Sequence, residues 1–175
     1  MIYFLEGVPE MPTTVPMPLE FRLPEGWLPA RPEGFNAADV AFAAVHPQPD
    51  AGFAANITID DDVPPDALTL ADLADTSVEH LREVAESVMV AHRREVGSFD
   101  APALAQRLVF STVVDGAHRG LVQSQVYLSL SDVKNSHKRA VIRLTLTATA
   151  GQHDAILGDF QDFVRIVGPD TGTAA

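Results

Sequence analysis

The sequence predicts an α+β domain in which one antiparallel sheet packs against helices. Apolar and polar residues alternate in several short segments, and one long segment instead repeats apolar residues at three- and four-residue steps. The segments follow one another in the order β-β-β-α-β-β-β-α, which is typical of helices laid on an antiparallel sheet. The chain has 175 residues and no cysteine, so we expect a core that needs no disulfide and no thiolate metal site.

Three short strands are predicted before the first helix, at residues 19–23, 39–45 and 53–59. The first strand runs into Pro24-Glu25-Gly26, a turn sequence, and is followed by Trp27, the single tryptophan. A segment rich in proline and glycine separates the second strand from the third, so these two strands are expected to form a hairpin.

A long helix is predicted over residues 70–93. Thr69 is a plausible N-cap with Asp72 three positions later, as in a capping box. The basic residues near residue 93 would suit the negative end of the helix dipole. One stripe is expected to be buried: Leu70, Leu73, Ser77, Leu81, Val84, Val88 and Ala91.

Period-two patterns return after Gly97, at residues 104–114, 120–130 and 139–149. Asp115-Gly116 marks a hairpin turn between the first two of these strands. A C-terminal helix follows residue 153, with Ile156, Phe160 and Phe163 on one stripe. The complete prediction is a sheet of about six strands, one long helix and one C-terminal helix.

We expect three parts in the chain. Residues 1–18 contain four prolines and are expected to form an extended arm, residues 19–167 a single α+β domain, and residues 168–175 a flexible tail. No run reaches the about 18 apolar residues that span a bilayer, and the first residues lack the basic region of a signal peptide. A cytoplasmic location is therefore expected, unless a signal segment has been removed.

The net charge of −12 is unevenly distributed. Residues 1–93 carry 16 acidic and 4 basic residues, whereas the 8 acidic and 8 basic residues of 94–175 cancel. The acidic half would repel nucleic-acid phosphates, so no nucleic-acid partner is expected. The acidity has two interpretations: it keeps the chain soluble, or it attracts a basic partner.

Three segments carry a resemblance to a known family: residues 21–27 (FRLPEGW), 56–59 (NITI) and 154–160 (DAILGDF). Together with the order of elements they resemble the actinobacterial LpqN/LpqT family of the PsbP-like fold, to which DcrB-like proteins and the Eag chaperones of type VI secretion are related. The resemblance implies a curved sheet. It also implies binding of a hydrophobic or lipidic ligand, of a secretion component or of another protein, and it carries no catalytic residue.

The residues themselves indicate no metal, cofactor or catalytic site. Asp60, Asp61, Asp62 and Asp66 lack the glycine and distant glutamate of an EF-hand, so a solvated loop is favoured over a cation site. The six histidines include no pair at i, i+4 spacing, and no Gly-x-Ser-x-Gly elbow is present. We therefore expect no enzyme. An unrecognised hydrolase would instead require a convergent polar pocket with strongly shifted pKa values.

Two surfaces are candidates for binding. The first is a polar sheet face, on which Tyr127 and Arg143 are the side chains best suited to anchor a partner. Its members are Gln123, Gln125, Tyr127, Arg143, Thr145 and Thr147. The second is a basic patch of Lys134, Lys138, Arg139 and Arg143, which either docks an acidic surface or keeps a hairpin soluble.

The sequence thus predicts a non-catalytic binding or accessory protein for a hydrophobic ligand or a protein partner, which binds on the sheet face or in the cleft between sheet and long helix. The alternative is a secretion-associated chaperone or adaptor that shields a hydrophobic segment of an effector. A homodimer, in which the basic patch meets the acidic half of another copy, stays open.

Overall fold

The structure, a computed structural model, describes residues 2–4, 19–32, 40–60, 69–98, 101–131 and 139–169. Its centre is an open seven-stranded antiparallel sheet with the order β3-β4-β5-β9-β8-β7-β6. The strands are β3 (Leu28–Ala30), β4 (Val40–Val45), β5 (Asn56–Asp60), β6 (Ser87–Gly97), β7 (Pro102–Val114), β8 (Ala117–Ser131) and β9 (Arg139–Thr149).

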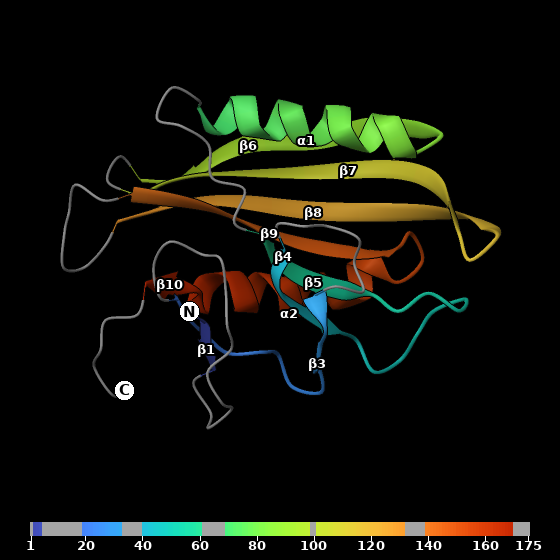
Figure 1. Ribbon diagram of the computed structural model, residues 1–175, viewed down its shortest axis with the longest axis horizontal. Helices are drawn as coiled ribbons and strands as arrows, with labels where there is room; N and C mark the ends of the chain where they lie inside the picture. Colours follow the sequence, from blue (N-terminus) through green and yellow to red (C-terminus); the bar gives the residue numbers. More distant parts are fainter. Residues whose placement is uncertain are drawn as a thin grey trace.

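Two helices lie on opposite faces of this curved sheet, as Figure 1 shows: α1 (Leu70–Val84) over the β6–β7 half and α2 (His153–Ile166) against the β5–β9 half. A second, small sheet is formed by β2 (Leu19–Phe21) between β1 (Ile2–Phe4) and β10 (Gly168–Pro169). The α+β class with an antiparallel sheet is therefore confirmed, while the strand number differs from the expected six.

The largest correction concerns residues 85–97. Of these, residues 85–93 were expected to complete the long helix, but α1 ends at Val84 and residues 87–97 form the edge strand β6. This strand pairs with β7 from Ser87 to Gly97, with a bulge between Val90 and His92. The hydrogen bonds and side-chain contacts made along this pairing outweigh the local helical spacing of the apolar residues. No glycine or proline marks the change from helix to strand.

A second correction concerns the first predicted strand. Residues 19–21 join the small sheet rather than the main one, and the short strand β3 takes the place beside β4. The predicted hairpin of β4 and β5 is confirmed, as is the hairpin of β7 and β8. At the turn of the latter, Asp115 and Gly116 both have positive φ, as a type I′ turn requires.

The start of α1 is built as predicted. Thr69 Oγ1 accepts from the backbone N–H of Asp72 at 3.1 Å, and Asp72 Oδ2 accepts from the backbone N–H of Thr69 at 3.0 Å. These two bonds hold the pKa of Asp72 below its usual value. The capping box satisfies N–H groups that a helix start otherwise leaves without partners.

The main core lies between α2, the small sheet and the inner face of the main sheet. Phe21 of β2 packs against Phe42 of β4 at 4.8 Å and against Phe163 of α2 at 5.7 Å between ring centroids. Trp27 is buried here and donates from Nε1 to Asp159 of α2 at 3.1 Å. One face of β9 completes this core with Ala140, Ile142, Leu144, Leu146 and Ala148.

The expected arm and tail lie largely outside the described residues. Within residues 1–18 the described part is β1, which pairs in parallel with β2. Within residues 168–175 it is β10, which pairs with β2 from the other side. In the part of the chain that the structure describes, no helix has the length and hydropathy needed to cross a membrane.

Candidate functional site

Part of the predicted polar sheet face lies beneath α1, which contacts Gln125, Tyr127 and Arg143. Gln125, Tyr127, Thr145 and Thr147 are buried, Gln123 is partly buried, and the side chain of Arg143 is 20% exposed. The expectation of a face open to a partner therefore needs correction at its buried members. The alternation of residues was interpreted correctly, but the sequence did not show that a helix covers this face.

These polar side chains form hydrogen bonds with one another and with α1. Gln106 Nε2 donates to Gln125 Oε1 at 2.7 Å, and Gln125 Nε2 donates to Ser77 Oγ of α1 at 3.0 Å. Tyr127 donates its hydroxyl to the carbonyl of Leu73 at 3.4 Å. Such buried polar groups require partners, and here the partners position α1 on the sheet.

Arg143 belongs to the same interior cluster. It lies directly opposite Asp60 in the β5–β9 register, donates from Nε to Asp60 Oδ2 at 2.7 Å and from a terminal nitrogen to Ser77 Oγ at 3.1 Å. Burial alone would lower the pKa of Arg143, but the charge and hydrogen bonds of Asp60, with a contribution from Tyr127, outweigh burial and raise it. The expected anchor is thus engaged in an intramolecular ion pair.

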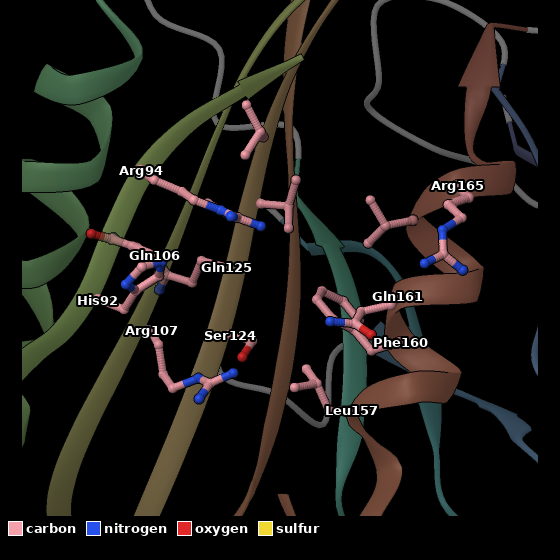
Figure 2. A pocket seen from close by; sticks show the side chains of 14 residues that line it. His92, Arg94, Gln106, Arg107, Ser124, Gln125, Leu157, Phe160, Gln161 and Arg165 are labelled. Atoms are coloured by element: carbon pink, nitrogen blue, oxygen red, sulfur yellow. The ribbon is translucent and has the colours of Figure 1, made fainter. Parts of the chain in front are cut away.

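A groove opens on the other face of the sheet, between α2 and the strands β6, β7 and β8 (Figure 2). It arises because α2 packs mainly on β9, while β6 and β7 extend beyond the helix. Its volume is about 730 Å³, within the range of small-molecule sites. Its apolar side chains come from both walls: Val96, Ala105, Val126, Leu157, Phe160 and Val164.

The charged side chains of the groove are all basic. His92 and Arg94 of β6, Arg107 of β7 and Arg165 of α2 line it, and no aspartate or glutamate among the described residues does so. Arg165 is paired with Asp162 at 2.7 Å. This concentration of positive charge contrasts with the net charge of −12.

The sequence pattern did not single out these basic residues as a binding site. His92 and Arg94 were assigned to the end of a helix, where their charge had a ready explanation in the dipole. The available signal was the charged residue Arg107. It lies between the buried Gln106 and Leu108 in the sequence and shares its face of β7 with the smaller Ala105 and Val109. It marks a face of β7 that is not entirely interior.

Ser124, which lines the groove, begins a hydrogen-bonded series that continues through His153 to Asp154. Ser124 Oγ lies 2.8 Å from His153 Nε2, and His153 Nδ1 lies 3.2 Å from Asp154 Oδ1. Burial of the ring lowers the pKa of His153, Arg107 lowers it further, and Asp154 opposes the shift. The imidazole is therefore neutral at pH 7.

This series has the atom order of a serine hydrolase triad, but its surroundings favour an anchoring role. Ser124 lies within a strand that is paired on both sides, so the adjacent backbone N–H groups serve the sheet and not an oxyanion. Asp154 is 91% exposed, where water screens its charge. The contact between Ser124 and His153 joins the start of α2 to β8.

The other predicted sites lie mainly outside the described residues. This applies to Lys134, Lys138 and the side chain of Arg139 in the basic patch, and to Asp61, Asp62 and Asp66 in the acidic loop. Within the described ranges, no group of three or more histidine, aspartate and glutamate side chains is arranged to hold a metal ion.

No protein-family model and no curated protein matches this sequence. Solved structures do match. LpqN, involved in cell envelope biogenesis of Mycobacterium tuberculosis, is 13% identical with a TM-score of 0.59 over 95% of this chain and 87% of that one. The PsbP protein CyanoP from Synechocystis is 14% identical with a TM-score of 0.56 over 87% and 86%. The Ran-binding protein Mog1p from Saccharomyces cerevisiae is 13% identical with a TM-score of 0.52 over 85% and 88%.

These similarities confirm the expected fold. The chain has the PsbP-like fold that it shares with LpqN and CyanoP. At such identities the likeness concerns the fold alone, so any function has to be argued from the groove.

Proposed function

We propose that this protein is a non-catalytic binding protein that holds a hydrophobic ligand in the groove between α2 and the β6–β8 part of the sheet. The observation that carries this proposal is the groove itself, which has about 730 Å³ of space and apolar side chains on both walls. Apolar side chains at the surface of a groove gain free energy when a ligand removes them from water. A binding or accessory role agrees with two proteins of similar fold, LpqN of cell envelope biogenesis and the Ran-binding protein Mog1p.

A substitution that fills the groove tests the proposal. Ala105 lies on its floor, and Ala105→Trp would occupy the space. Ala117→Trp is a matched control, because Ala117 is exposed at the β7–β8 hairpin and does not line the groove. We expect Nile red, a neutral apolar dye, to bind the unmodified chain and the control with enhanced fluorescence and to lose this signal with Ala105→Trp. Equal signals from all three proteins would contradict the proposal.

A protein partner is the second candidate, favoured by apolar residues beside the groove. Met89 of β6 and Val113 of β7 are 58% and 51% exposed, and the strand register places both on the face of the sheet that carries the groove. A chaperone or adaptor would use such residues to shield an apolar segment of its client. We expect the chain to keep an apolar 20-residue peptide in solution, and Met89→Asp with Val113→Asp to abolish this. Precipitation of the peptide with the unmodified chain, or equal protection by the unmodified chain and the variant, would reject this candidate.

A further inference from the structure

Two arginines in the groove have no acidic partner. Among the described residues, no carboxylate lies within 4.0 Å of the guanidinium of Arg94 or Arg107, whereas Arg93, Arg143 and Arg165 each have one. Figure 2 shows both unpaired side chains extending from the sheet toward α2. A chain with twice as many acidic as basic residues thus leaves two cations without partners at one place.

The strand register brings these cations together. Arg107 is directly opposite His92, and Arg94 is opposite Ala105, so Arg94 and Arg107 are diagonal neighbours on one face of the sheet. Diagonal neighbours on adjacent strands are about 7–8 Å apart at their Cα atoms, close enough for two long side chains to reach one anion. Two like charges this close repel each other, and an anion between them would offset that repulsion.

The arrangement of polar and apolar residues in the groove is that of an amphiphile site. The cations come from β6 and β7, while Leu157, Phe160 and Val164 of α2 supply the opposite wall. We propose that the groove binds a single-chain amphiphile with an anionic headgroup, a carboxylate or phosphate monoester, with the headgroup at Arg94 and Arg107 and the hydrocarbon chain against Phe160 and Val164. This proposal rests on the proposed function and names the class of its ligand.

The guanidinium groups favour this class over a neutral amphiphile. Their planar donor pairs match the oxygens of carboxylates and phosphates, and such charge-assisted bonds are stronger than neutral ones. The positive charge of Arg107 also lowers the pKa of the nearby buried His153. Arg165, already paired with Asp162, would contribute less to anion binding.

Isothermal titration calorimetry tests the proposal with three probes: dodecyl phosphate, dodecyl maltoside and inorganic phosphate. Both amphiphiles are kept below their critical micelle concentrations. We expect dodecyl phosphate to bind most tightly, at least about tenfold above the neutral dodecyl maltoside, and more weakly as salt is added. Arg94→Gln and Arg107→Gln should each weaken the affinity for dodecyl phosphate by about tenfold and leave the affinity for dodecyl maltoside unchanged. Arg31→Gln is the charge-matched control, because Arg31 is exposed beside β3, at the opposite edge of the sheet.

The outcomes separate this proposal from the one it rests on. Equal affinities for both amphiphiles, unchanged by Arg94→Gln and Arg107→Gln, would overturn the anionic headgroup and leave the hydrophobic groove standing. If inorganic phosphate bound as tightly as dodecyl phosphate, the proposed contact of the hydrocarbon chain with the groove would be overturned. Heat of binding from none of the three probes, together with no Nile red signal, would reject both proposals.

Discussion

Replacement of Arg143 by methionine should destabilise this protein strongly. The substitution keeps most of the aliphatic stem but removes the guanidinium that donates to Asp60 and Ser77. Asp60 has only 3% of its side chain exposed, so the change takes this cation away from a carboxylate that water does not reach. Loss of one partner from a buried ion pair costs about 3–5 kcal/mol.

The lower end of that range applies here, because the side chain of Arg143 is itself 20% exposed. A loss of about 3 kcal/mol in the free energy of unfolding corresponds to a fall of about 6–12 °C in Tm for a chain of this size. Urea unfolding followed by circular dichroism measures the loss, with Arg31→Met as a control that should stay within about 0.5 kcal/mol.

A double-mutant cycle with Asp60→Asn separates the ion pair from general effects of the substitution. If the two residues act as a pair, the double variant should be more stable than the sum of the single losses predicts, by about 1 kcal/mol or more. A loss below about 1 kcal/mol for Arg143→Met would refute the reasoning, because that is the behaviour of an exposed pair. Arg143 would then be available as the partner anchor that the sequence predicted.

Three further predictions concern stability. Because folding lowers the pKa of His153, the contribution of this residue to folding stability is fully present above the unfolded pKa of about 6.5 and is lost as pH falls below it toward the folded pKa. The Tm of His153→Gln should therefore fall less than the Tm of the unmodified chain between neutral and mildly acidic pH. Parallel profiles of Tm against pH would argue against this. Thr69→Ala removes the acceptor of the α1 capping box and should cost about 1 kcal/mol in urea unfolding, whereas an unchanged midpoint would show that the cap contributes nothing. Trp27→Phe keeps an aromatic ring but leaves Asp159 without its donor, with an expected loss of about 1 kcal/mol or more and a contrary result if Tm is unchanged.

The sequence determined the features that depend on neighbouring residues. The hairpin at Asp115-Gly116 was predictable because these residue types tolerate the positive φ of its turn. The start of α1 was predictable because Thr69 and Asp72 satisfy each other's backbone at a spacing of three. The burial of one face of β9 follows from the alternation of apolar and polar residues over residues 142–149.

Only the tertiary structure decided that residues 87–97 form a strand and where the groove lies. Local spacing allowed a helix there, and pairing with β7, distant in the chain, made them a strand. Alternation shows that a strand has two faces, but not which helix covers each of them. Here α1 covers the polar face of Gln125 and Tyr127, while α2 leaves part of the other face open beside Arg94 and Arg107. The candidate site therefore depends on contacts between segments that no local pattern encodes.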